Sequence, residues 1–203
     1  SKTKSFYHSV SSGDLNGDGR LDFIGLHMGT NGDWGDNLHP YTQSSDGTFS
    51  ETRSLINYDK LQQFDNKWSA GAVLVTSLFN NGTPEIIRGS YGHSITQKNI
   101  YGFAVFSLNN TTKQYEVSYL PSNIGAFTST EFGSTSIKVT DVNKDGKKDI
   151  IFAGEGNNNM AIQVFLNNGK NEFNPGQLIS YTFDKMQFRE FNLVDYDQDG
   201  DDD

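Results

Sequence analysis

Three segments of the chain carry oxygen-bearing side chains at positions 1, 3, 5 and 9 of nine residues, with glycine at position 6. These segments are residues 14–22, 141–149 and 195–203. Ca²⁺ is a hard cation that takes about six to eight oxygen ligands, and a tight loop supplies them from alternate residues. The glycine permits the sharp turn that such a loop needs. The repeated pattern therefore predicts three calcium sites.

The candidate ligands are the side chains at positions 1, 3, 5 and 9, together with the backbone carbonyl at position 7. They are Asp14, Asn16, Asp18, Arg20 (backbone oxygen) and Asp22 in the first loop; Asp141, Asn143, Asp145, Lys147 (backbone oxygen) and Asp149 in the second; and Asp195, Asp197, Asp199, Asp201 (backbone oxygen) and Asp203 in the third.

A fourth copy of the pattern is degenerate. Residues 77–85 fit the same frame, with Gly82 at position 6 and Glu85 at position 9, but position 3 is Phe79. A phenyl ring offers no ligand to a hard cation. We expect the same loop shape there, without Ca²⁺.

The flanking residues indicate strands and exclude an EF-hand. An EF-hand needs a glutamate at position 12 and a helix on each side, whereas position 12 here is Gly25 in the first loop and Phe152 in the second. Apolar residues alternate before each loop, and runs such as 21–26 and 149–153 follow it. Both patterns are typical of strands, so the unit is strand, loop, strand.

The loops recur at a spacing that indicates a repeat architecture. They start at residues 14, 77, 141 and 195, and a third apolar run, a polar turn and an edge-like strand follow the first pair of strands. Four antiparallel strands per unit make the blade of a β-propeller. The sequence predicts an all-β fold with approximate units 5–68, 69–132, 133–186 and a truncated 187–203.

The motif, an apolar residue followed by the Asp-x-Asn/Asp-x-Asp-Gly-x-x-Asp loop, resembles the FG-GAP repeats of the integrin α-subunit head and the related bacterial VCBS repeats. That resemblance covers nearly the whole chain. It implies blades that usually number seven to a ring, with calcium between the first two strands of a blade. Residues 1–203 would then form one partial propeller domain, about three blades and the start of a fourth, within a longer polypeptide.

Composition narrows the classes of function. Cysteine is absent, so no disulfide holds the fold. The net charge is −9, which argues against nucleic-acid binding because that requires a basic stripe. No apolar stretch approaches the length of a membrane span. Calcium loops of this kind imply a calcium-rich compartment, so we expect a secreted or cell-surface protein.

The strand order places the long connections 27–38, 90–100 and 154–160 at the end opposite the calcium loops. Long loops on a rigid scaffold are where binding concentrates. Aromatic, amide and carboxylate side chains there would suit a sugar, although an ordinary polar loop with its tryptophan packed inward explains them too. The candidate ligand-binding residues are His27, Asp33, Trp34, Asp36, His39, Tyr91, His93, Asn157 and Asn158.

Three functions remain open at this point. The leading hypothesis is a non-catalytic, calcium-stabilised propeller that binds a protein or glycan, as in adhesion. The alternative is a catalytic or accessory propeller of a secreted polysaccharide-degrading enzyme, in which His27, His93, Tyr91 and Asp33 would act as base and acid. A weaker alternative is the shell domain of a secreted toxin.

Overall fold

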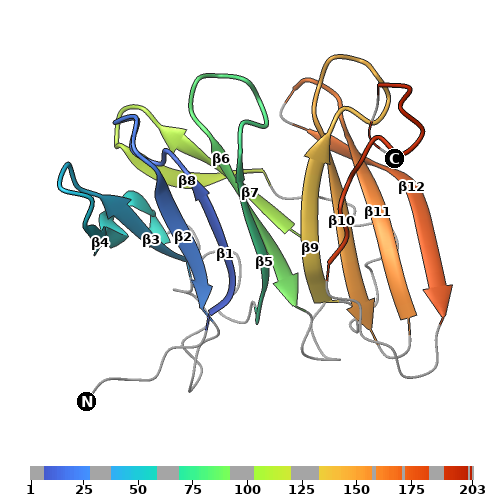
Figure 1. Cartoon of the computed structure of the whole chain (residues 1–203), viewed down its shortest axis with the longest axis horizontal. Helices are drawn as coiled ribbons and strands as arrows, with labels where there is room; N and C mark the ends of the chain where they lie inside the picture. Colours follow the sequence, from blue (N-terminus) through green and yellow to red (C-terminus); the bar gives the residue numbers. More distant parts are fainter. Residues whose placement is uncertain are drawn as a thin grey trace.

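The computed structural model describes residues 7–27, 38–58, 69–91, 103–119, 133–156, 159–170, 172–182, 190–200 and 202. The chain forms three successive four-stranded antiparallel sheets (Figure 1). The prediction of an all-β fold built from four-stranded units is confirmed.

Within each sheet the strands lie in chain order, and every strand is antiparallel to the next. The first sheet contains β1 (Tyr7–Gly13), β2 (Asp22–His27), β3 (Leu38–Gln43) and β4 (Phe49–Glu51), followed by a short 3-10 helix, η1 (Arg53–Leu55); the second contains β5 (Ser69–Thr76), β6 (Glu85–Tyr91), β7 (Phe103–Asn109) and β8 (Gln114–Tyr119); the third contains β9 (Gly133–Thr140), β10 (Asp149–Gly156), β11 (Asn159–Asn167) and β12 (Phe173–Thr182). One backbone pairing, Tyr91 with Gly133, joins the second sheet to the third.

The first strands of the sheets lie side by side, with β5 between β1 and β9 (Figure 1). The hydroxyl oxygens of Ser9 and Ser11 accept hydrogen bonds from the backbone N–H groups of Val73 and Val75, at 3.1 and 2.8 Å. Residues 64 positions apart are joined in both cases. Side chains of β1 thus satisfy donors on the edge of β5 that no backbone ladder reaches.

Two apolar cores fill the spaces between the sheets. Residues of the second sheet alternate between them: Ile86 and Phe106 face the first sheet, while Ile87 and Phe103 face the third. This alternation follows from the two-residue period of a strand, which sends neighbouring side chains to opposite faces. The middle sheet is therefore buried on both faces, which is why its strands are rich in apolar residues.

The third long connection differs from expectation. Residues 154–160 were predicted as a loop, but β10 and β11 continue to pair as far as Gly156 with Asn159. Backbone pairing extends the strands into the polar stretch, because polar side chains do not interrupt an antiparallel ladder. Only two residues are left between these strands.

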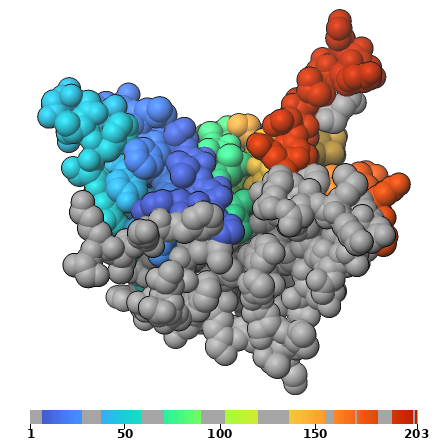
Figure 2. Space-filling view, turned by 60° about the horizontal axis from the view of Figure 1, so that its bottom comes forward, coloured from blue at the N-terminus to red at the C-terminus, as the bar shows by residue number. Residues whose placement is uncertain are grey.

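The segment that should open a fourth unit is also different. Residues 190–195 form no strand and pair with no strand in the described part of the chain. Their ties are side-chain contacts: the ammonium of Lys138 donates to the Asn192 side-chain oxygen at 3.1 Å and lies 3.6 Å from a Glu190 oxygen. The C-terminal segment stands out from the body of the molecule (Figure 2).

Among the described residues, no helix has the length and apolar character needed to cross a membrane.

The serine contacts between the first two sheets give a testable prediction. Ser11→Ala leaves the Val75 N–H without its acceptor in a buried strand, so we expect the free energy of unfolding to fall by about 1–2 kcal/mol. Ser12→Ala on the exposed side of the same strand is the matched control and should change it by less than about 0.5 kcal/mol. Urea unfolding of both variants measures the difference, and equal effects would contradict this role of Ser11.

Candidate metal centres

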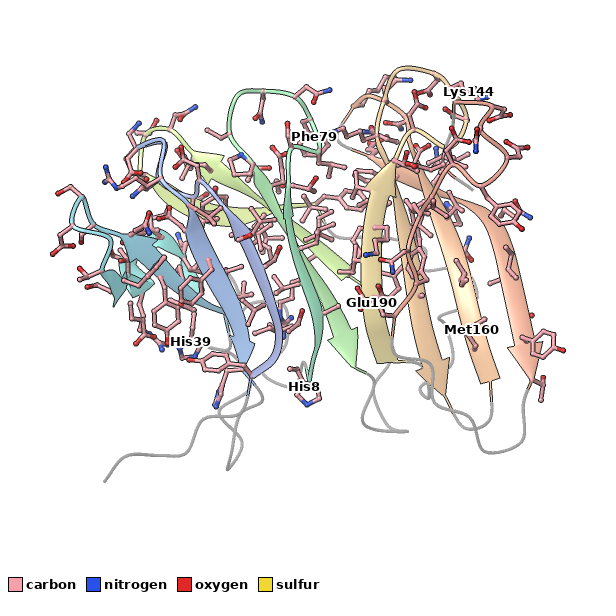
Figure 3. The ribbon with its side chains drawn as sticks, viewed as in Figure 1. His8, His39, Phe79, Lys144, Met160 and Glu190 are labelled. Atoms are coloured by element: carbon pink, nitrogen blue, oxygen red, sulfur yellow. The ribbon has the colours of Figure 1, made fainter. Side chains whose placement is uncertain are left out.

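The predicted calcium loops and the degenerate loop gather at one end of the sheets. The loop 14–22 joins β1 to β2, 77–85 joins β5 to β6, and 141–149 joins β9 to β10. Phe79 and Lys144 mark this end, whereas His8 and His39 lie at the opposite end (Figure 3). The three loops therefore lie at the same end of their sheets.

The first aspartate of each loop organises the turn. One Asp14 oxygen accepts the N–H of Asp18 at 3.1 Å, and the other accepts the N–H of Gly19 at 2.8 Å. The same two bonds recur at Asp141 and at Asp195, with lengths between 2.7 and 3.1 Å. The chain thus wraps around this carboxylate through local hydrogen bonds alone.

Two positions of each loop lie in the left-handed region of φ. Glycine at position 6 was predicted to serve this purpose, and its φ values run from 80° to 97°. Position 4 is left-handed too, which the sequence did not reveal, because lysine and glutamine there carry no signature of it. The residues at positions 4 and 6 are Gly17 and Gly19, Asn80 and Gly82, Lys144 and Gly146, and Gln198 and Gly200.

The side-chain oxygens at positions 1, 3 and 5 face a common point in the last loop. Asp195, Asp197 and Asp199 each offer a carboxylate oxygen within 4.8 Å of the others. In the first loop the position-3 oxygen, from Asn16, accepts the N–H of Asp18 at 3.0 Å. A donor set made only of oxygen suits Ca²⁺ and other hard cations, so these residues fit the ion that the sequence predicts.

The ninth residue has a structural role that the sequence did not predict. Asp22 is fully buried; one of its oxygens accepts the N–H of Leu15 at 2.9 Å and the other accepts the N–H of Gln43 at 2.9 Å. Asp149 makes the same pair of bonds to Val142 and Asn167, at 2.9 and 2.8 Å. This carboxylate therefore ties the loop to the third strand of its sheet.

The degenerate loop has the predicted shape, with left-handed residues at positions 4 and 6. Its side chains at positions 3, 5 and 9 contact other protein groups. Glu85 is buried and accepts the N–H of Leu78 at 2.8 Å, as the ninth aspartate does elsewhere. The Asn81 amide donates to the other Glu85 oxygen at 2.9 Å, and the Phe79 ring packs against Phe173 at 6.2 Å. The absence of Ca²⁺ from this loop stays a prediction.

At the opposite end, the structure brings together two of the predicted ligand-binding residues. The rings of His27 and His39 lie 5.4 Å apart, and Tyr7 stands 5.8 and 5.9 Å from them. The His39 Nδ1 atom lies 2.7 Å from a Glu51 oxygen. The sequence did not single out Tyr7 or Glu51, because only the pairing of β1, β2, β3 and β4 places them there.

Several predicted site residues fall outside the described part of the chain. They are Asp33, Trp34, Asp36, His93, Asn157, Asn158, Asp201 and Asp203, together with the side chain of Tyr91.

The His27 ring is partly buried at this end of the first sheet. Its Nε2 atom is buried and has no hydrogen-bond partner among the described residues. Burial, followed by the nearby His39 and Arg53, lowers the pKa of His27 below its ordinary value of 6.5. This environment therefore favours the neutral form of the ring.

Comparison with known families supports the resemblance over one segment. Residues 141–203 match the family model described as an FG-GAP-like repeat. This segment includes two of the three predicted calcium loops, so the suspected FG-GAP resemblance is confirmed there. No curated protein matches the chain.

Comparison with solved structures finds similarity to two rhamnogalacturonan lyases. The crystal structure of the exotype rhamnogalacturonan lyase YesX is 13% identical, with a TM-score of 0.44, over 87% of this chain and 33% of that one. The Bacillus licheniformis rhamnogalacturonan lyase PL11 is 16% identical, with a TM-score of 0.46, over 98% of this chain and 39% of that one. The chain thus spans about a third of the first structure and 39% of the second.

The buried carboxylate at position 9 and the exposed carboxylate at position 5 should contribute differently to stability. Unfolding measured in EDTA, without bound metal, tests this difference. Asp149→Asn replaces one acceptor oxygen by an NH₂ group, so a buried N–H of Val142 or Asn167 loses its partner and unfolding should become about 1–3 kcal/mol easier. Asp145→Asn, at an exposed position, should cost less than about 1 kcal/mol. Denaturant unfolding checks both, and a larger loss from Asp145→Asn would contradict the structural role of position 9.

The environment of His27 predicts a pH dependence. Because its pKa is lower in the folded state, the unfolded chain binds the proton first, and stability falls as the pH drops below about 6.5. His27→Phe should remove part of this loss, because phenylalanine carries no group that binds a proton. Thermal unfolding between pH 7.5 and 5 measures the effect; parallel curves for wild type and His27→Phe would contradict it.

Proposed function

We propose that this chain is a calcium-binding, non-catalytic recognition module of the β-propeller type. The observation that carries the proposal is the set of loops at one end of the sheets, each folded around its first aspartate with oxygen donors at positions 1, 3 and 5. Hydrogen bonds from backbone N–H groups to the first aspartate hold the turn in each loop, so the oxygen ligands are arranged before an ion arrives. Preorganisation of this kind favours binding because little ordering remains to be done.

In this proposal the three sheets are blades of a larger ring. The FG-GAP resemblance implies a ring of seven blades, all formed by the same polypeptide. The second residue of each loop supports it. Leu15 and Leu78 are each 1% exposed, because each side chain lies in the core between its own sheet and the next one. Val142, the equivalent residue of the third sheet, is 43% exposed, and a following blade would cover it.

The ligand of the module is a protein or a glycan, bound at the end opposite the calcium loops. The support is the predicted ligand-binding set on the connections at that end, of which His27 and His39 flank the first. Loops of this type hold Ca²⁺ with dissociation constants on the order of 10⁻⁴–10⁻³ M in extracellular modules. We therefore place the protein outside the cell or on its surface.

Calcium binding has a direct test. In about 10 mM Ca²⁺ we expect the Tm to rise by roughly 5 °C or more over the value in EDTA, because each filled site adds about 1–3 kcal/mol to the free energy of unfolding. The triple variant Asp18→Asn, Asp145→Asn, Asp199→Asn should lose most of this shift. Mg²⁺ at the same concentration is the control for ionic strength, and a Tm that is independent of Ca²⁺ would overturn the proposal.

A further inference from the structure

In the loops 14–22, 77–85 and 141–149, the side chain at position 7 contacts the side chain at position 5. The Arg20 guanidinium is hydrogen-bonded and ion-paired to Asp18, and the Lys147 ammonium lies 2.6 Å from an Asp145 oxygen. In the degenerate loop the Thr83 hydroxyl donates to the Asn81 side-chain oxygen at 3.2 Å. Two loops that offer ligands for a cation thus already hold a cationic side chain.

The neighbouring hairpin turn holds each of these cations in place. The Arg20 Nε atom donates to the Gln43 carbonyl at 2.8 Å, at the end of β3. The Lys147 stem runs over Gly169 in the β11–β12 turn, where a Cβ would lie 2.9 Å from the Lys147 Cε. Two different contacts therefore place a positive charge at the same position in two loops.

The position-5 carboxylate has both oxygens engaged in this arrangement. In the loop 141–149, Asp145 Oδ1 accepts the backbone N–H of Lys147 at 2.9 Å. Its Oδ2 accepts from the Lys147 ammonium and, at 3.3 Å, from the Asn143 amide. A calcium ion that needs an oxygen of Asp145 must share it with the ammonium or turn the ammonium away.

We propose that Arg20 and Lys147 are built-in competitors of Ca²⁺ that weaken the affinity of loops 14–22 and 141–149. This inference rests on the calcium-binding function proposed above. A unit charge a few ångströms from a divalent ion, in water and salt, corresponds to about a three- to tenfold change in affinity. The loop 195–203 carries Asp201 at position 7, so it lacks the competitor and fills at lower calcium concentration.

The test needs a separate signal for each loop, which the position-6 glycines provide. The N–H groups of Gly19, Gly146 and Gly200 each bond to the first aspartate of their own loop. Their ¹⁵N–¹H resonances can be followed during a Ca²⁺ titration of the intact chain. In wild type, we expect the midpoint of Gly200 to precede those of Gly19 and Gly146.

The variant Lys147→Met removes the charge and keeps an unbranched stem over Gly169. We expect the Gly146 midpoint to fall to about one third to one tenth of the wild-type concentration. The midpoints of Gly19 and Gly200 should stay unchanged. Arg20→Met gives an independent test, because it should lower the Gly19 midpoint alone.

Lys148→Met is the matched control for charge. Lys148 carries the same charge one residue away, but its ammonium donates to the Ser77 carbonyl of the neighbouring loop at 2.9 Å. It should move the Gly146 midpoint by less than about twofold, because the charge lies farther from the ligands. Effects of equal size from Lys147→Met and Lys148→Met would overturn direct competition in favour of a general effect of net charge.

The remaining outcomes separate this inference from the proposed function. If the glycine signals respond to Ca²⁺ but Lys147→Met and Arg20→Met leave their midpoints unchanged, calcium binding stands and the competition is wrong. If no glycine signal responds in wild type or in either variant, both proposals fail. Unfolding curves in EDTA confirm that each variant is folded, as expected for substitutions at partly exposed side chains.

Discussion

Each sheet depends on the hydrogen bonds of one buried carboxylate, which belongs to the aspartate or glutamate at position 9 of its loop. Asp22, Glu85 and Asp149 are completely removed from solvent, where an unbonded carboxylate would be strongly unfavourable. Each is compensated by backbone N–H groups of its own loop, and the two aspartates also accept one from the third strand. Because both sets of donors must converge on one side chain, the loop cannot shift relative to its sheet.

The same loops are coupled to the packing between sheets through their second residue. Leu15 donates its N–H to Asp22 while its side chain enters the core between the first and second sheets. Leu78 does the same with Glu85 and the core between the second and third sheets. One residue therefore contributes both to the geometry of the loop and to the packing of two neighbouring sheets. An ion that stiffens the loop would also stiffen the packing between the sheets.

This coupling offers a physical reason for a fold without disulfides. The apolar cores hold neighbouring sheets together, and hydrogen bonds such as those of Ser9 and Ser11 satisfy the strand edges that face one another. The exposed loops then remain free to present acidic side chains at one end. Arg20 and Lys147 offset part of that acidity where it is most concentrated, next to the position-5 carboxylates.

The sequence by itself determined the features that depend on near neighbours in the chain. Alternating apolar residues identified the strands, and glycine at position 6 with aspartate at positions 1 and 5 identified the turns. The shape of the degenerate loop 77–85 also followed from its frame. These features are local, since a left-handed glycine or an aspartate bonded to the N–H four residues on needs no partner elsewhere.

The tertiary structure decided whatever depends on register between strands. That Asp22 would accept the N–H of Gln43, or that Gly169 would make room for Lys147, requires the third strand and its turn to lie beside the loop. The meeting of His27, His39 and Tyr7 likewise needs three strands in one register. Contacts of this kind join residues far apart in sequence whose types carry no signal of pairing, so only the folded sheet reveals them.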